Sequence, residues 1–175
     1  MEFGRVQLNS MATALNLAYL SLGSNIGDRE THLHEAIVRL QSEGRVVLVS
    51  SFYETEPVEF AGQAWFLNCA LALETTRTPQ QLMSDILAIE QEMGRQRIQK
   101  KGPRIIDIDI LLFSDKIIDL PDLTVPHPAM QHRRFVLEPL AEIAPEARHP
   151  VLKITIRELV DALPMGQTVQ KSQKK

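Results

Sequence analysis

The sequence predicts an α+β protein with a ferredoxin-like βαββαβ core, in which helices pack on an antiparallel sheet, followed by C-terminal additions. Apolar, β-branched runs alternate with segments of helical periodicity in the order strand, helix, strand, strand, helix, strand. The chain has 175 residues, of which 44% are hydrophobic and 23% are charged. That size and composition suit one globular domain with a sizeable core.

The first strand and the first helix open this core. Residues 17–22 form an apolar run that predicts a strand, and the glycine-containing turn 23–28 follows it. Asp28 suits the N-cap of a helix that ends near Gly44. The apolar face of that helix is predicted from residues spaced at i, i+3, i+4 and i+7, namely Leu33, Ala36, Ile37 and Leu40.

Two strands and a second helix come next. Residues 46–54 predict one continuous strand, residues 55–63 a Pro- and Gly-containing loop, and residues 66–74 a third strand. Thr78-Pro79-Gln80-Gln81 is a strong helix start, with Thr at the N-cap, Pro in the first turn and Gln three residues after the cap. The helix is expected to end at Gly94 and to bury Leu82, Ile86, Ile89 and Met93.

The fourth strand, within residues 105–113, carries Asp107 and Asp109 inside an apolar run. Because successive side chains of a strand alternate faces, the two carboxylates are predicted to share one face. The opposite face is then apolar, with Ile106, Ile108, Ile110 and Leu112. Two nearby carboxylates at a partly buried position need a raised pKa or a neutralising cation, and a hard divalent metal such as Mg²⁺ meets this need. The alternative is a solvated pair on an exposed strand face.

A basic cluster precedes the acidic strand and consists of Arg95, Arg97, Lys100, Lys101 and Arg104. The guanidinium group is a planar, permanently charged fork that suits phosphate. A metal on the carboxylates can bridge phosphate oxygens while the arginines neutralise the remaining charge. The two clusters together predict a site for a small phosphorylated ligand, and a solvated basic loop is the alternative.

The C-terminal part is expected to add smaller elements around a single domain that spans residues 17–163. Ile117 and Ile118 predict an edge strand, and residues 134–143 predict a helical stretch interrupted by Pro139. A last helix is predicted over residues 155–163, with Thr155 as N-cap and Glu158 completing a capping box. Residues 1–16 form an N-terminal extension, and residues 164–175 form a polar, basic tail that is expected to fray.

The overall charge and the single cysteine exclude several classes of protein. A net charge of −3 with mixed signs argues against nucleic-acid binding, which requires a broad basic face. Cys69 lies in an apolar run and is predicted to be a small buried side chain in a reducing compartment. No apolar segment approaches transmembrane length, and residues 1–16 lack the features of a signal peptide. We therefore expect a cytoplasmic monomer that binds neither nucleic acid nor membrane.

Several motifs occur together in a specific order along residues 17–163. They are Gly23-Ser24-Asn25, Phe52-Tyr53-Glu54-Thr55-Glu56-Pro57, Phe66-Leu67-Asn68, Glu90, Gly94-Arg95-Gln96-Arg97, Gly102-Pro103-Arg104, the Asp107 and Asp109 pair, and Leu123-Thr124-Val125-Pro126-His127-Pro128. In this combination the sequence resembles the 6-hydroxymethyl-7,8-dihydropterin pyrophosphokinases of folate biosynthesis. The resemblance implies a Mg²⁺-dependent transfer of diphosphate from ATP to the pterin hydroxymethyl group, with AMP as the second product. Because the chain has no room for another full domain, we expect a stand-alone enzyme.

The resemblance also implies roles for individual residues. The expected catalytic residues are Arg95, Arg104, Asp107 and Asp109, and the two aspartates are expected to hold two Mg²⁺ ions. The expected ATP-binding residues are Glu90, Arg97, Arg104, Ile110, Thr124, His127 and Arg133. The expected pterin-binding residues are Thr55, Val58, Phe66, Asn68 and Phe135, with the two phenylalanines as stacking faces and the asparagine as the amide that reads the ring edge.

The sequence also allows other interpretations of the same residues. His127 also fits a hydrogen-bonded loop histidine, and Phe66 and Phe135 also fit ordinary core packing. Paired carboxylates with arginines suit a metal-dependent phosphohydrolase as well, and the fold class suits a non-catalytic ligand-binding module. Nucleotide contacts are further expected to differ where the chain departs from the family pattern, at Lys101, Asp122 and Pro128.

Overall fold

The computed structural model describes residues 13–58, 62–96 and 102–173. Its main sheet contains six antiparallel strands in the order β5-β1-β4-β3-β8, and β2 also pairs with β4. The strands are β1 Asn16–Ser24, β2 Arg45–Val49, β3 Tyr53–Thr55, β4 Phe66–Thr75, β5 Asp107–Phe113 and β8 Val169–Lys171. The order of β5, β1, β4 and the β2/β3 segment confirms the predicted ferredoxin-like arrangement.

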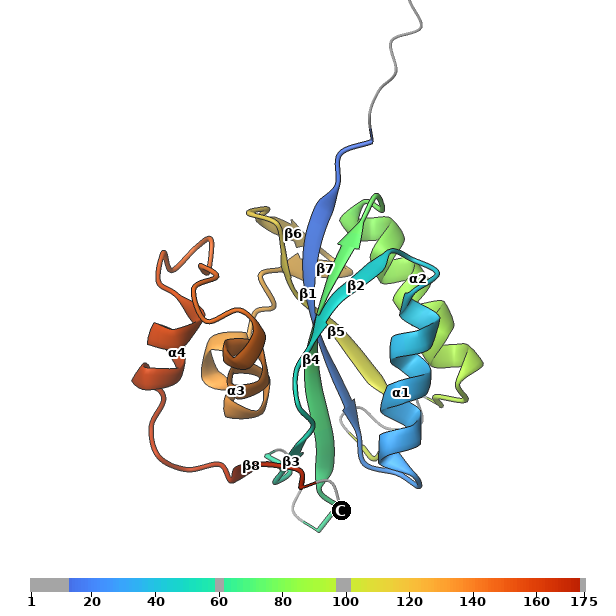
Figure 1. Ribbon diagram of the computed structural model, residues 1–175, viewed down its shortest axis with the longest axis vertical. Helices are drawn as coiled ribbons and strands as arrows, with labels where there is room; N and C mark the ends of the chain where they lie inside the picture. Colours follow the sequence, from blue (N-terminus) through green and yellow to red (C-terminus); the bar gives the residue numbers. More distant parts are fainter. Residues whose placement is uncertain (1–12, 59–61, 97–101, 174–175) are drawn as a thin grey trace, which may run out of the picture.

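Helices cover both faces of this sheet (Figure 1). The helices α1 Arg29–Leu40 and α2 Pro79–Glu92 lie on one face, and α3 Arg134–Ile143 and α4 Ile156–Ala162 lie on the other. A short 3₁₀ helix, Met130–His132, leads into α3. No helix in the described ranges is long and apolar enough to cross a membrane.

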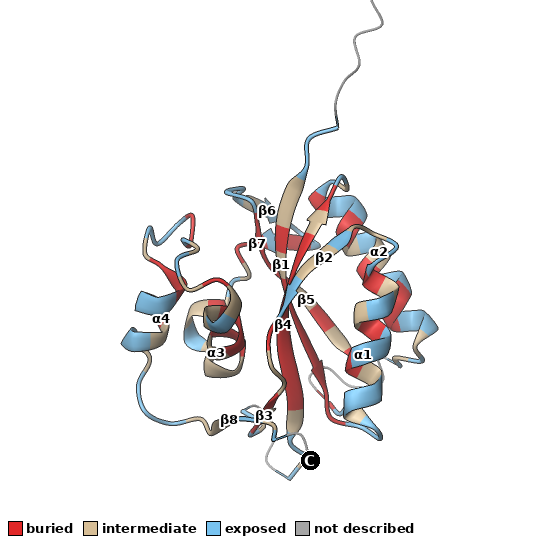
Figure 2. Ribbon diagram, viewed as in Figure 1, coloured by how far each residue is buried: buried red, intermediate tan, exposed pale blue. Residues whose placement is uncertain are grey.

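The buried side chains form two cores, one on each face of the sheet, as the distribution of buried residues in Figure 2 shows. The first core joins the sheet to α1 and α2 and includes Leu20, Leu33 and Ile86. The second joins it to α3 and α4 and includes Leu137 and Ile156. Burial of this apolar surface is the main force that holds the helices on the sheet.

The capping residues predicted from the sequence start their helices as expected. The Asp28 side chain accepts a hydrogen bond from the backbone N–H of Thr31 at the start of α1. Thr78 with Gln81, and Thr155 with Glu158, form complete capping boxes at α2 and α4. Cys69 is fully buried in the first core, where burial raises the pKa of its thiol to about 12, as suits a small buried side chain.

The prediction of a single strand over residues 46–54 is wrong, because this segment is divided into β2 and β3 around Ser50. The backbone N–H of Ser50 donates to Ala70 O at 2.8 Å, and the Ser50 hydroxyl accepts from Ala70 N at 2.9 Å. A side-chain oxygen thus replaces the backbone carbonyl as the partner of β4. The replacement ends the regular ladder while the chain remains against β4.

The prediction that Leu112 lies on the same face as Ile108 and Ile110 is also wrong. The register between β1 and β5 shifts so that Ile110 lies opposite Leu20 and Leu112 opposite Tyr19, which leaves Leu111 as an extra residue. Leu111 and Leu112 therefore both pack in the second core, and Phe113 enters the first. The bulge comes after Asp109, so the predicted alternation holds through the acidic pair.

Three further predictions for the C-terminal part need correction. Ile118 belongs to β6 Ile118–Leu120, which pairs with β7 Leu123–Val125 in a separate two-stranded sheet. Helix α3 is continuous through Pro139, because buried residues on both sides of it outweigh the one hydrogen bond that proline cannot donate. The tail expected to fray contains β8, which pairs with β3, since the free edge of β3 accepts a strand without needing an apolar pattern.

Candidate active site

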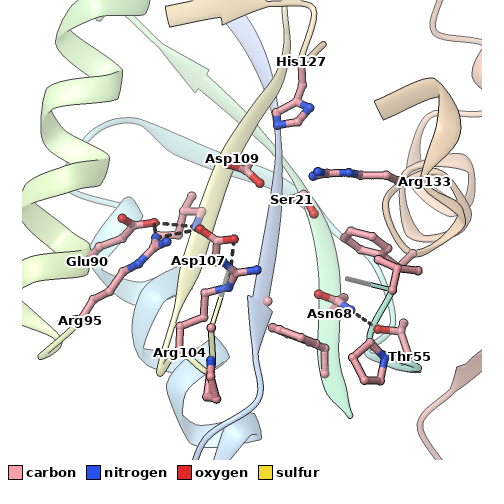
Figure 3. Close-up of a pocket in the computed structure, with 18 of the residues that line it drawn as sticks. Ser21, Thr55, Asn68, Glu90, Arg95, Arg104, Asp107, Asp109, His127 and Arg133 are labelled. Atoms are coloured by element: carbon pink, nitrogen blue, oxygen red, sulfur yellow. Dashed lines mark hydrogen bonds and ion pairs between the residues drawn. The ribbon is translucent and has the colours of Figure 1, made fainter. Parts of the chain in front are cut away.

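A cavity of about 730 Å³ lies over the sheet face that carries Asp107 and Asp109. Its walls come from β1, β3, β4, β5, α2 and the start of α3, together with the loops that join them. The lining includes twelve of the fifteen predicted site residues: Thr55, Val58, Phe66, Asn68, Glu90, Arg95, Arg104, Asp107, Asp109, His127, Arg133 and Phe135. Figure 3 shows the charged residues and Asn68, the residue with a side-chain amide, around the same cavity.

Three predicted site residues do not line this cavity or cannot be placed. The side chain of Ile110 is 2% exposed and packs in the first core. Thr124 is exposed on β7, where it pairs with Asp119 of β6. Arg97 lies outside the described residues. Their proposed contacts with the nucleotide stay predictions.

The two aspartates project from neighbouring positions of one strand face. Asp107 Oδ1 lies 2.7 Å from Arg95 Nη1, and Asp107 Oδ2 lies 3.3 Å from Arg104 Nε. Burial, and then the charge of Asp107, raise the pKa of Asp109 to about 7, although Arg133 and Arg104 oppose the shift. The interpretation of a solvated pair on an open strand face is therefore wrong.

Glu90 connects helix α2 to the edge of β5. Its side chain is 3% exposed, and its Oε1 accepts a hydrogen bond from the backbone N–H of Ile108 at 2.8 Å. The same oxygen forms an ion pair with Arg95. Burial alone would lower the pKa of Arg95, but Asp107 and Glu90 outweigh it and raise that pKa, so the guanidinium stays charged. Glu90 thus holds Arg95 beside the acidic pair.

Asn25 joins three loops around the cavity and was not assigned a role from the sequence. Its Oδ1 accepts from Arg104 N at 2.8 Å, and its own N–H donates to Arg104 O at 3.1 Å. Its Nδ2 donates to Gln63 Oε1 at 3.0 Å and to Ala64 O at 3.2 Å. An asparagine just after the first predicted strand was the available signal, but its burial and its distant partners were not visible in the sequence.

The other end of the cavity is built around Asn68 and Thr55. Both side chains are buried, and Asn68 Nδ2 donates a hydrogen bond to Thr55 Oγ1. Gly23 makes room for this amide, because a Cβ atom at that position would lie 2.4 Å from Asn68 Oδ1. Gly23 lies within β1 and not in the predicted turn, and glycine is needed there because β1 and β4 approach closely at this pair.

Two phenylalanine rings line the cavity, and each lies below an arginine. The Arg104 guanidinium carbon is 5.4 Å from the centre of the Phe66 ring, and that of Arg133 is 5.7 Å from the centre of the Phe135 ring. Phe66 is half-buried and lines the cavity, while Phe135 also packs against the second core. Both rings can therefore offer a face to a planar ligand.

His127 is both a hydrogen-bonded loop histidine and a cavity residue. Its backbone N–H donates to Leu111 O at 2.9 Å, and its Nδ1 accepts from Ala129 N at 3.3 Å. Burial, with a further contribution from Arg133, lowers the pKa of His127. The ring is then neutral at pH 7, and because Nδ1 accepts, its proton is on Nε2.

The carboxylates of Asp107 and Asp109 could hold a magnesium ion whose other ligands come from a phosphorylated substrate and water. The described part of the chain has no group of three or more His, Cys, Asp or Glu residues placed to hold a metal by itself. Mg²⁺ commonly takes one or two carboxylates and completes its shell with phosphate oxygens and water. Asp107 and Asp109 supply such a pair, and the burial and the Asp107 charge that raise the pKa of Asp109 are both costs that a bound cation would offset.

Comparison with known proteins identifies the family. The model of the family described as 7,8-dihydro-6-hydroxymethylpterin-pyrophosphokinase matches residues 19–145. The 2-amino-4-hydroxy-6-hydroxymethyldihydropteridine pyrophosphokinase of Bacillus subtilis is 50% identical over 130 residues, which cover 73% of this chain and 78% of that protein. The protein of the same name from Aquifex aeolicus is 41% identical over 140 residues, which cover 80% of this chain and 88% of that protein.

Longer proteins match over only part of their length. The folic acid synthesis protein fol1 of Schizosaccharomyces pombe is 43% identical over 155 residues, which cover 87% of this chain and 21% of that protein. A solved Plasmodium falciparum HPPK-DHPS structure aligns with a TM-score of 0.68 and 22% identity, over 87% of this chain and 45% of that one, which supports the fold. From the matched family, the close relatives and the cavity, we conclude that this chain belongs to the 7,8-dihydro-6-hydroxymethylpterin-pyrophosphokinase family, whose reaction is a step of folate biosynthesis.

Proposed function

We propose that this protein transfers diphosphate from ATP to the hydroxymethyl oxygen of 6-hydroxymethyl-7,8-dihydropterin in a Mg²⁺-dependent reaction. The observation that carries the proposal is the division of one cavity into two chemically different ends. Asp107, Asp109 and the arginines beside them form a charged end, and Asn68 with Thr55 forms an amide end between aromatic rings. A substrate pair of triphosphate and heterocycle matches these two ends.

The metal would be held by Asp107 and Asp109, with two ions expected. When bound, Mg²⁺ neutralises phosphate oxygens and helps to align the attacking and leaving groups. Asp107 now pairs with Arg95 and Arg104, so those guanidinium groups must give up part of this contact when the carboxylate binds a metal. They are then available for the phosphate oxygens that arrive with the metal.

The nucleotide would lie at the charged end. Arg95, Arg104 and Arg133 line this end and can neutralise the triphosphate, with Arg95 held in place by Glu90. The neutral His127 can donate its Nε2 proton to a nucleotide oxygen. Roles for Arg97, Ile110 and Thr124 in binding ATP are part of the same proposal, on the strength of the sequence resemblance.

The pterin would lie at the amide end. Its planar bicyclic ring suits stacking between Phe66 and Phe135, and the buried Asn68 amide suits the polar edge of the ring. Thr55 fixes the Asn68 amide by accepting one of its hydrogen bonds. Val58, which is 57% exposed beside the cavity, provides apolar contact at its rim.

In the reaction, the pterin hydroxymethyl oxygen forms a bond to the β-phosphorus of ATP. The bond between the β-phosphorus and the oxygen that bridges it to the α-phosphorus breaks, and AMP leaves with that oxygen. The hydroxyl proton passes to solvent water as the new bond forms, so the products are AMP, the pterin diphosphate and one proton. The arginines at the charged end stabilise the negative charge that the transferred diphosphate carries.

The test is AMP formation from ATP and Mg²⁺ with and without 6-hydroxymethyl-7,8-dihydropterin. The proposal predicts pterin-dependent AMP that is lost in Asp107→Ala and Asp109→Ala and that requires Mg²⁺. Phosphate released without pterin would indicate a phosphohydrolase, and ligand binding without turnover would indicate a non-catalytic module. Sedimentation of the same preparation tests the expected monomer, and cell fractionation tests the expected location in the cytoplasm.

A further inference from the structure

Gln167 joins two walls of the cavity that come from distant parts of the chain. Its Oε1 accepts a hydrogen bond from the backbone N–H of Phe135 at 3.2 Å. Its Nε2 donates to the backbone carbonyl of Glu56 at 2.8 Å. One half-buried side chain therefore links the start of α3 to the loop that leaves β3.

The start of α3 has no cap of its own. Arg133 is at the N-cap position and makes no side-chain capping hydrogen bond. The first N–H groups of a helix have no partner within the helix and need one from elsewhere. Gln167 supplies that partner to Phe135, whose ring lines the cavity, and so fixes the first turn of α3 at this residue.

The loop after β3 is held by the same segment. Glu56 directly follows Thr55, and its N–H donates to Thr168 O at 3.2 Å. Its carboxylate Oε2 accepts from Thr168 N at 3.4 Å. With Gln167, these contacts leave the backbone next to Thr55 little freedom to move away from the cavity.

The strand that follows Gln167 has a separate anchor. β8 pairs with β3, and Lys171 Nζ lies 3.3 Å from Glu142 Oε2 on α3. The same carboxylate accepts hydrogen bonds from Tyr53 and Ser51. A change confined to the Gln167 amide should therefore leave the C-terminal strand docked.

We propose that Gln167 is a positioning residue for the pterin: it sets the separation between the wall that carries Phe135 and the wall that carries Thr55. The proposal rests on the function proposed above, since it assigns the pterin to this end of the cavity. Gln167 acts through backbone hydrogen bonds, so the loss of its amide is expected to weaken pterin binding. The charged end, which Glu90 and Asn25 hold, is expected to keep its affinity for nucleotide.

The test compares Gln167→Met with Gln170→Met. The first variant removes both hydrogen-bonding groups at similar side-chain length, and the second makes the same change at an exposed position of β8 that does not line this cavity. Dissociation constants are measured for 6-hydroxymethyl-7,8-dihydropterin and, separately, for an unreactive ATP analogue with Mg²⁺. Thermal unfolding and amide hydrogen exchange at Phe135, Thr55, Glu56 and Val58 are measured without ligand.

Gln167→Met is expected to raise the pterin dissociation constant about tenfold and to leave that of the nucleotide within about twofold of wild type. Exchange at Phe135 is expected to accelerate roughly fivefold, and the loss of two hydrogen bonds is expected to lower the unfolding midpoint of Gln167→Met by no more than a few degrees relative to Gln170→Met. Equal pterin affinity in the two variants would overturn the proposal. So would an equal loss of both substrates with a lowered midpoint, because that result means general destabilisation.

The ligand-free measurement keeps this proposal separate from the proposed function. If wild-type protein bound no pterin, the proposed function would fail, and the assignment of Gln167 to a pterin would fail with it. Exchange would still show whether Gln167 fixes the two walls. If wild-type protein binds pterin and the exchange rates do not change in Gln167→Met, the positioning role is overturned while the function stands.

Discussion

Arg95 Nη1 lies 2.7 Å from Asp107 Oδ1, so one carboxylate of the acidic pair is held by a cation of the protein itself. Glu90 Oε1 forms an ion pair with the same nitrogen of Arg95. At Asp109, two residues along the strand, burial and then the charge of Asp107 raise the pKa to about 7. The two aspartates therefore differ in their surroundings: Asp107 is paired with arginines, and Asp109 is harder to ionise.

Asp109→Asn is expected to abolish activity and, without metal, to stabilise the fold at pH 8. The raised pKa means that the folded state resists ionisation of this carboxyl, so its contribution to stability falls as the pH rises from about 4 to about 7. The gain in the variant should thus be present at pH 8 and small at pH 4. Urea unfolding at both pH values measures it, with Asp115→Asn, an exposed aspartate, as control. A variant less stable than wild type at pH 8 would contradict the assigned cost of ionising Asp109 at this position.

Glu90→Gln is expected to lower kcat by roughly tenfold to a hundredfold. The amide can still accept from Ile108 N–H, but it loses the charge that holds Arg95 beside Asp107. Steady-state kinetics at saturating substrates measure the effect. Glu92→Gln, on the exposed side of the same helix, is the matched control, and equal activity of the two variants would refute the role of Glu90.

Asn25→Ala is expected to cost about 2–3 kcal/mol of stability, because it leaves the Arg104 N–H and other buried polar groups without their partner. The loosened loops should also lower kcat/KM. Denaturant unfolding and kinetics on the same preparation measure both effects. Asn16→Ala removes longer hydrogen bonds, of 3.4 and 3.5 Å, and should change neither quantity much. An Asn25 variant as active and stable as the Asn16 variant would show that the loops do not depend on this side chain.

Gly23→Ala is expected to weaken pterin binding at least tenfold, since the new methyl group would displace the Asn68 amide. The Asn68 to Thr55 hydrogen bond would be disturbed at the same time. Titration with pterin measures the loss. Gly166→Ala is the control because a Cβ atom there would meet nothing within 4 Å. Unchanged pterin affinity in Gly23→Ala would argue against Asn68 as the group that reads the ring edge.

Glu142→Gln is expected to reduce stability at pH 7 by about 1 kcal/mol, with the difference lost in acid. Burial alone would raise the pKa of Glu142, but hydrogen bonds from Tyr53, Ser51 and Lys171 outweigh it and lower that pKa. A lowered pKa stabilises the fold above the unfolded value of about 4.3, and this contribution is lost as the pH falls through the folded value. Unfolding at pH 7 and pH 3 tests this, with the exposed Glu146→Gln as control. A constant difference at both pH values would exclude the charge as its source.

Local patterns were sufficient for much of the fold. The caps at Asp28, Thr78 and Thr155 depend on neighbours within three residues, and the structure confirms them. The alternation that places Asp107 and Asp109 on one face also depends only on adjacent positions in a strand. These features could be predicted because both partners of each interaction are close in the chain.

Interactions between distant segments could not be predicted in this way. Ser50 divides a strand because its hydroxyl meets Ala70, and Leu112 changes face because β1 imposes a bulge on β5. Strand β8 exists because β3 offers a free edge to it. The polarity and periodicity of the sequence at those positions do not predict which distant segment will pack against them.

The sequence by itself determined the order of the elements, the acidic pair on its strand and, through its motifs, the family. Only the tertiary structure decided which side chains hold the cavity together: Glu90 against Arg95, Asn25 among three loops, and Gln167 between α3 and the loop after β3. The physical reason is that helix and strand patterns arise from near neighbours. Buried polar groups instead take whichever partners the packed chain brings within hydrogen-bond distance.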